Sequence, residues 1–260
     1  MKGAPAAEPG TGPVATAGPG EQGPRTVVLP DIYWVGIPGG DFVYQKGERG
    51  SLPAFFVARY PVTNVQYQTF IDADGYRDER WWTDLVRPEP EESRWSQANR
   101  PRTNVNWYEA VAFSRWLSAQ FGHEVRLPTE DEWERAARGY DGREYPWGDG
   151  YRTGYANIDE KATQAGEWYL EQTTAVGVYP HAASLGGILD LAGNVWEWCL
   201  NKWERPEQFE ADTSDDARML CGGCWSRDAA YARGAQRFAL PPGYRSLING
   251  FRLVSSGPIA

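Results

Sequence analysis

The second half of the chain lacks the periodicity that regular secondary structure imposes on a sequence. From Gly139 to the C-terminus, Gly, Trp, Asn and Pro recur without helical spacing. Short strands and long packed loops are therefore expected there, and such loops need a large apolar interior to hold them. The 13 Trp, 14 Tyr and 9 Phe of the 260-residue chain can provide it, because each buried aromatic side chain removes about 150–250 Å² from water. The sequence predicts an α+β domain with little regular structure.

Two or three helices are predicted in the first half of the chain. Thr63 can cap a helix that ends near Gly75, and Asn104 or Asn106 can cap a longer one that ends at Phe121-Gly122. A third, short helix follows Pro128, where Thr129 and Glu132 have the spacing of a capping box. Strands are expected at 33–37 and 41–44 around a Pro-Gly-Gly turn, and at 55–60. The acidic, Pro-containing stretch 77–100 is interpreted as a surface excursion.

The N-terminal residues 1–26 differ in composition from the rest. They are almost wholly Gly, Ala, Pro, Glu, Thr and Gln, which cannot bury enough apolar surface to offset the entropy of ordering. We predict a disordered tail at 1–26 and one domain at 27–256.

Net charge and the distribution of apolar residues limit the possible partners. The formal charge is −9, and no Lys/Arg block is present, so a surface that follows nucleic-acid phosphates is not expected. No stretch of 18 apolar residues could span a membrane, and the N-terminus lacks the apolar core of a secretory signal. These features predict a cytoplasmic protein; display on a surface would need another export route.

The three cysteines, Cys199, Cys221 and Cys224, are too few for a disulfide scaffold. We expect reduced thiols. Zinc at the Cys221-x-x-Cys224 spacing is not expected, because His123 and His181 are the only histidines that could complete four ligands.

Seven segments in order resemble the formylglycine-generating-enzyme/sulfatase-modifying-factor family over roughly residues 33–255. They read Ile37-Pro38-Gly39-Gly40-Asp41-Phe42, Tyr60-Pro61-Val62-Thr63-Asn64, Pro101-Arg102-Thr103-Asn104-Val105-Asn106-Trp107, Arg126-Leu127-Pro128-Thr129-Glu130-Asp131-Glu132-Trp133-Glu134, Tyr145-Pro146-Trp147-Gly148, Asp190-Leu191-Ala192-Gly193-Asn194-Val195-Trp196-Glu197-Trp198, and Gly222-Gly223-Cys224-Trp225 with Gly250-Phe251-Arg252-Leu253. The resemblance implies a C-type-lectin-like fold with short antiparallel strands.

The same resemblance implies a possible structural calcium and no other required cofactor. Gly193 and Val195 would bind calcium through carbonyls, with Asn194 and Glu197 nearby, since calcium takes hard oxygen ligands. A hydrogen-bonded loop without metal would satisfy the same residues. At a second family site, around Asn157 and Ile158, this sequence departs from the family, because Trp168 stands where an acidic ligand is needed.

Catalysis is where the sequence departs from the family. The copper-binding thiol pair of formylglycine formation would fall at Arg227 and Ala232, and neither residue can form a thiolate. Related sulfoxide-synthase-type iron enzymes need a three-histidine cluster, and the chain has two histidines. A copper oxidase that uses Cys221 and Cys224 instead is the alternative.

The last segment resembles the variable region of diversity-generating-retroelement variable proteins. Framework residues such as Gly222, Arg233, Arg237, Arg245 and Arg252 alternate there with residues of every chemical kind. In that family the intervening side chains form an exposed surface that binds a protein or surface ligand. The predicted contacts are Cys224, Ser226, Arg227, Asp228, Ala229, Ala230, Tyr231, Gly234, Gln236, Phe238, Ala239, Leu240, Gly243, Tyr244, Ser246, Leu247 and Asn249. The alternative is an ordinary domain of the first family whose polar loop has lost its asparagines through sequence drift.

Overall fold

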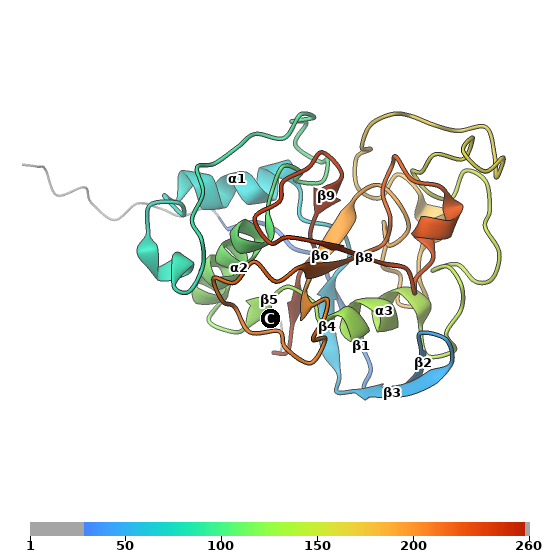
Figure 1. The fold of residues 1–260 in the computed structure, drawn as a ribbon, viewed down its shortest axis with the longest axis horizontal. Coiled ribbons are helices and arrows are strands. Elements are labelled where there is room, and N and C mark those ends of the chain that lie inside the picture. The colour runs from blue at the N-terminus through green and yellow to red at the C-terminus, as the bar shows by residue number, and fades with distance from the viewer. Residues whose placement is uncertain (1–28, 258–260) are drawn as a thin grey trace, which may run out of the picture.

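The computed structural model describes residues 29–257, so the tail predicted at 1–26 lies outside the described residues. Three small sheets and three α-helices alternate with long loops (Figure 1). This confirms an α+β fold with little regular structure. Within residues 29–257, no helix combines the length and the apolar character needed to cross a membrane.

The first sheet joins the beginning of the domain to its end. Its strand order is β1 (Trp34–Ile37), β4 (Phe55–Ala58), β10 (Val254–Ser255) and β5 (Val125–Arg126), and every pairing is antiparallel. The last strand of the chain, β10, thus lies inside the sheet between β4 and β5. This sheet can be complete only when the C-terminal segment has returned to the N-terminal strands.

The strands predicted at 33–37 and 41–44 exist as β1 and β2 (Gly40–Tyr44), but they do not pair with each other. Strand β1 pairs with β4, while β2 pairs with β3 (Glu48–Leu52), which was not predicted. Gly40 has a φ of +136°, a backbone conformation that favours glycine. The chain therefore turns between two sheets at this point, where the sequence suggested a hairpin.

The third sheet supports the last segment. Its order is β8 (Arg237–Leu240), β7 (Arg218–Cys221), β6 (Trp196–Lys202) and β9 (Asn249–Gly250). Strand β9 runs parallel to β6, and the other pairs are antiparallel. Strand β6 is buried along its whole length, so it is the central support of this half of the molecule.

The three helices begin where the capping residues predicted them. Helix α1 (Asn64–Asp72) is capped by Thr63, α2 (Trp107–Phe121) by Asn106, and α3 (Glu130–Arg138) follows Thr129. In each case the side chain three residues after the cap accepts a hydrogen bond from the backbone N–H of the cap. Short 3-10 helices occupy η1 (Glu79–Trp82), η2 (Pro180–Ala182) and η3 (Ala229–Ala232).

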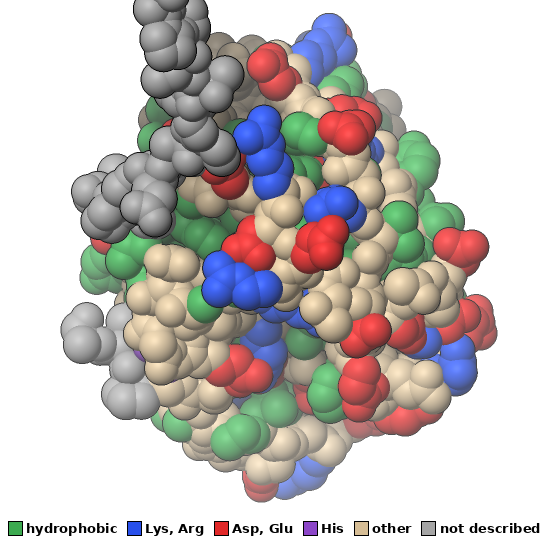
Figure 2. All heavy atoms as spheres, turned by 90° about the vertical axis from the view of Figure 1, so that its left-hand side faces the viewer, with side chains coloured by type: hydrophobic (Ala, Val, Ile, Leu, Met, Phe, Trp, Pro, Cys, Tyr) green, Lys and Arg blue, Asp and Glu red, His purple; other side chains and the backbone are tan. Residues whose placement is uncertain are grey.

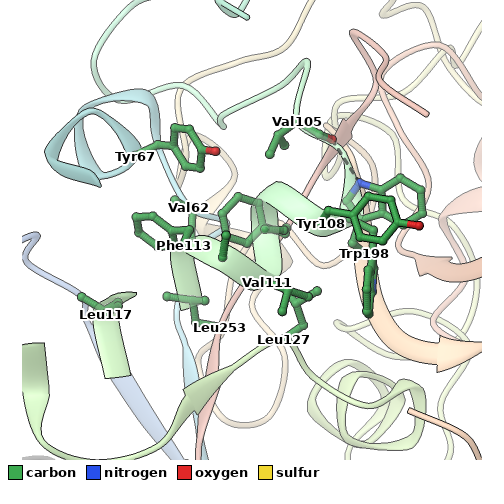
Figure 3. Close-up of a cluster of buried hydrophobic side chains, with 14 of the residues drawn as sticks. Val62, Tyr67, Val105, Tyr108, Val111, Phe113, Leu117, Leu127, Trp198 and Leu253 are labelled. Atoms are coloured by element: carbon green, nitrogen blue, oxygen red, sulfur yellow. Dashed lines mark hydrogen bonds between the residues drawn. The ribbon is translucent and has the colours of Figure 1, made fainter. Parts of the chain in front are cut away.

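A large aromatic and aliphatic cluster lies between α1, α2 and the sheets. Tyr67, Phe113 and Leu253 point into it, and Trp198 donates from Nε1 to the carbonyl oxygen of Val105 at 3.2 Å (Figure 3). Trp82 and Leu85 are also buried in this cluster. The stretch 77–100 is therefore not a pure surface excursion, because part of it closes the core.

The most deeply buried ion pair joins Glu197 on β6 to Arg252, and both side chains are fully buried. Arg252 donates from Nε and Nη2 to the two carboxylate oxygens at 2.6 and 2.7 Å, and Trp133 donates to the same carboxylate at 2.6 Å. The remaining guanidinium hydrogens reach the carbonyl oxygens of Ala58, Arg59 and Leu189. Such complete pairing is what makes a buried charge tolerable.

Replacing Arg252 by Met should leave the Glu197 carboxylate buried without a cation. We expect Arg252→Met to lower the free energy of unfolding by about 3–5 kcal/mol, measured by urea denaturation. The control is Arg80→Met, which breaks the exposed pair with Asp78 and should leave the denaturation midpoint unchanged. Equal effects of the two variants would contradict a central role for the buried pair.

Candidate functional site

The candidate ligand-binding segment leaves the third sheet at a tight glycine turn. Gly222 and Gly223 have φ values of +97° and +75°. A Cβ atom at Gly223 would lie 2.7 Å from the carbonyl oxygen of Tyr231, so no other residue fits without moving the backbone. The turn directs the chain from β7 into the η3 loop, which then returns to the sheet as β8.

Four arginines fasten this segment to carboxylates on earlier parts of the chain. Arg233 pairs with Glu144 at 2.6 Å, Arg237 with Glu130 at 2.5 Å, Arg245 with Glu109 at 2.6 Å and Arg252 with Glu197 at 2.6 Å. The first pair is partly exposed and the last fully buried. The framework positions therefore have a physical role that sequence spacing alone did not specify.

Burial gives the Arg237 anchor an unusual electrostatic setting. Glu130 begins α3, and burial raises its pKa to about 7, although Arg237 and the Tyr44 hydroxyl favour the charged carboxylate. Tyr44 donates to Glu130 at 2.5 Å, and Arg237 in turn donates to the Tyr44 oxygen. Strand β8, helix α3 and strand β2 are thus joined by one polar cluster.

The Arg245 anchor holds the loop before β9 against the start of α2. Arg245 donates to both oxygens of the fully buried Glu109, which also accepts a hydrogen bond from Tyr76. Burial opposes the charge of Arg245, but hydrogen bonding and the charge of Glu109 outweigh it and raise the pKa of Arg245. Arg245 is therefore held in its charged form.

Between the anchors, part of the predicted contact set faces solvent. The exposed members are Arg227, Ala230, Tyr231, Gly243 and Tyr244. The half-buried members are Ser226, Asp228, Gln236, Phe238, Ala239, Leu240, Ser246 and Leu247. Phe238 stacks on the buried Trp196 with ring centroids 5.4 Å apart, so much of that ring supports the sheet.

Four predicted contacts are corrected because they are buried: Cys224, Ala229, Gly234 and Asn249. Cys224 and Asn249 are 0% exposed. A Cβ atom at Gly234 would lie 2.5 Å from Cγ of Arg138. Ala229 is the first residue of η3, and its carbonyl accepts a hydrogen bond from the Tyr145 hydroxyl. In this structure these four side chains are covered and are not part of the exposed surface.

The structure also places beside the candidate segment aromatic residues that were not among the predicted contacts. Trp225 stacks with Tyr169 (centroids 6.4 Å apart) and meets Trp95 edge-on at 5.6 Å. Trp168, beside Tyr169, is 60% exposed. The loop that contains them borders the candidate segment, because Asp159 donates from its backbone N–H to the carbonyl of Arg227. These residues come from three separate stretches, so no local spacing could have grouped them.

The two thiols of the C-x-x-C spacing do not form a common site. Cys221 packs in the core cluster around Trp133, with its sulfur 3.9 Å from that of Cys199, whereas Cys224 belongs to the other large cluster. Burial raises the pKa of all three thiols, which disfavours the thiolate form that metal binding needs. In the part of the chain described, no three His, Cys, Asp or Glu side chains converge as metal ligands.

The predicted calcium ligands already have other partners. The Glu197 carboxylate faces Arg252 and Trp133. The Asn194 side-chain oxygen accepts from Thr174 and Asn157, and the Gly193 carbonyl accepts from the Val195 backbone N–H. Glu197 in particular does not fit, because a calcium ion beside it would lie next to a guanidinium. Buried oxygens without a partner, Asn157 Oδ1 and Thr174 Oγ1, do lie beside Asn194.

Calcium at Gly193, Asn194, Val195 and Glu197 thus stays a prediction. Differential scanning calorimetry of the protein with calcium and with a chelator tests whether the ion binds. A bound structural ion would raise the melting temperature in proportion to the logarithm of free calcium above its Kd. Identical melting curves, with magnesium as the control ion, would count against calcium at this loop.

Two glycines of the last segment, one buried and one exposed, provide a matched test of how closely the segment is packed. Gly234→Ser should lower the free energy of unfolding by about 1–3 kcal/mol, because the new side chain overlaps Arg138. Gly243→Ser should be tolerated, since no atom lies within 4 Å of its Cβ position. Thermal denaturation compares them, and an equally stable Gly234→Ser variant would contradict the burial of that position.

Comparisons with known proteins place this geometry among related domains. The family model described as "Sulfatase-modifying factor enzyme 1-like domain" matches residues 23–256. The hercynine oxygenase of Mycolicibacterium thermoresistibile is 32% identical and the alignment covers 90% of this chain, but this chain spans only 59% of that protein. The formylglycine-generating enzyme of Mus musculus is 27% identical, with 88% of this chain and 76% of that protein covered.

Among solved structures, Treponema denticola variable protein 1 has a similar fold. It superposes with a TM-score of 0.64 at 23% sequence identity, and covers 90% of this chain and 98% of its own. This agrees with the C-type-lectin-like fold expected from the sequence motifs.

Proposed function

The chain belongs to the sulfatase-modifying factor enzyme 1-like family, and from this premise we propose that it is a non-catalytic binding protein whose exposed C-terminal residues contact a protein or surface ligand. One observation carries the proposal. Along the last segment, arginines anchored to carboxylates alternate with side chains that face solvent. Side chains between fixed points can be replaced without loss of the frame, as in other loop-based binding surfaces.

The contact surface of the proposal combines aromatic and charged groups. Tyr231 is 37% and Tyr244 50% exposed, and Arg227 lies over the Tyr231 ring at 5.5 Å. Exposed aromatic side chains give large contact areas at small entropic cost. Tyr231 also meets Trp196 edge-on, so its ring is positioned by the buried sheet while part of the residue stays exposed.

Catalysis by the family's thiol chemistry is disfavoured in this proposal. The two positions that correspond to the thiol pair hold Arg227 and Ala232, and the cysteines present are buried in separate clusters with raised pKa values. Diversification of the exposed residues and display on a cell or phage surface are parts of the same proposal. An activity like that named for the hercynine oxygenases is a second candidate, because one such protein is 32% identical to this chain over 90% of its length, although this chain spans only 59% of that protein.

Two libraries test whether the segment is a replaceable surface. One randomises the exposed positions Arg227, Ala230, Tyr231, Gly243 and Tyr244, and the matched one randomises the buried Cys224, Ala229, Gly234 and Asn249. We expect most members of the first library to keep a cooperative thermal transition and most members of the second to lose it. Equal loss of folding in the two libraries would contradict the proposal.

A copper titration tests the catalytic alternative. Competition with a copper(I) chelator should show no affinity that depends on Cys224, so Cys224→Ser and the unmodified protein should behave alike. The positive control is the double variant Arg227→Cys with Ala232→Cys, which restores thiols at the family's positions. Copper(I) bound by the unmodified protein and lost in Cys224→Ser would favour an oxidase.

A further inference from the structure

A pocket lies between the start of α1 and the loop at 92–98, whose Trp95 contacts Trp225 of the candidate site. Its volume is about 390 Å³, and its walls include Asn64, Gln68, Glu92, Ser96 and Arg102. That volume falls within the range of small-molecule sites in proteins. No residue of the proposed contact surface lines it.

Arg102 brings an unpaired positive charge to this pocket. The residue is 5% exposed, and its Nε atom is buried without a hydrogen-bond partner. Its guanidinium donates from Nη2 to the Glu91 carbonyl and lies 4.6 Å over the Tyr67 ring. Among the described residues, no carboxylate forms an ion pair with it. A buried cation of this kind favours an anionic partner, because its charge is poorly solvated.

Asn64 provides an acceptor in the same pocket. Its Nδ2 atom donates to the carbonyl oxygens of Trp95 and Gln97 at 2.8 and 2.9 Å, which fixes the orientation of the amide. The Oδ1 atom is consequently directed away from these carbonyls, and it is buried without a partner. Buried polar atoms in folded proteins are nearly always paired, whereas two residues of this pocket wall, Asn64 and Arg102, each carry one buried polar atom without a partner.

Charges of both signs flank the pocket. The exposed Glu92 side chain lies in the wall of the pocket. The pocket also borders the first residues of α1, where the helix dipole has its positive end. The side of the molecule that carries α1 shows acidic and basic side chains interspersed (Figure 2). A ligand with a single charge would meet one favourable and one unfavourable wall.

We propose that this pocket binds a small zwitterion of the α-amino-acid class. The carboxylate pairs with the Arg102 guanidinium, and the ammonium group donates to Asn64 Oδ1 and to the Glu92 carboxylate. Arg102 Nε and Asn64 Oδ1 are shielded from bulk solvent, so binding requires side chains that line the pocket, such as the exposed Glu92 and Ser96, to move. The inference is independent of the proposed function, because the two sites share no residue.

Calorimetric titration of the full chain with each of the common free amino acids tests the proposal. We expect saturable binding of at least one of them below about 10 mM, and no binding of acetate or methylammonium, which each carry one of the two charges. Binding of acetate as tight as that of the amino acids, or no binding of any amino acid, would overturn the proposal.

Variants separate the two ends of the ligand. Glu92→Gln should weaken binding at least tenfold, whereas the control Glu89→Gln, with the same charge change on the same loop outside the pocket, should leave the Kd within about twofold. Arg102→Gln should abolish binding. Ala98→Trp should also abolish binding, because its side chain fills the pocket from an exposed position, and it provides the test if Arg102→Gln fails to fold. Equal Kd values for Glu92→Gln and Glu89→Gln, or undiminished binding by Ala98→Trp, would refute the site.

Discussion

The pairing of arginines in the last segment with carboxylates on earlier elements is the constraint on which the rest of the structure depends. The Arg252–Glu197 pair is the most deeply buried of the four. It lies where β10 inserts between β4 and β5, so its hydrogen bonds to the carbonyls of Ala58 and Leu189 connect both halves of the domain. A chain with so little regular structure cannot rely on helix and sheet ladders alone. Ionic contacts that are fully hydrogen-bonded fix its loops at defined points.

This arrangement separates two kinds of position that are adjacent in sequence. Arg245 is held by the buried Glu109, while Tyr244 beside it is 50% exposed. Gly234 has no space for a side chain, whereas Gly243 has open space around it. A surface built in this way can change its chemistry at the exposed positions without disturbing the anchors. That property supports a binding role more directly than any single residue does.

Local signals in the sequence predicted the helices well and the sheets poorly. Thr63, Asn106 and Thr129 each begin a helix because capping depends on residues three positions apart. The pairing of β1 with β4 depends instead on residues about twenty positions apart, and that of β10 with β4 on residues about two hundred positions apart. A Pro-Gly-Gly turn between two strand-like stretches is equally consistent with a hairpin and with a corner between sheets. The sequence could not distinguish them.

By itself, the sequence determined the family, the starts of the helices and the framework arginines of the last segment, because these follow from residue identity and short spacing. Only the tertiary structure decided which residues between the framework positions face solvent. Cys224, Ala229, Gly234 and Asn249 are covered by side chains distant in sequence, and Trp95 and Tyr169 reach Trp225 from other loops. Burial in an irregular segment is set by long-range packing, which leaves no periodic trace in the order of the residues.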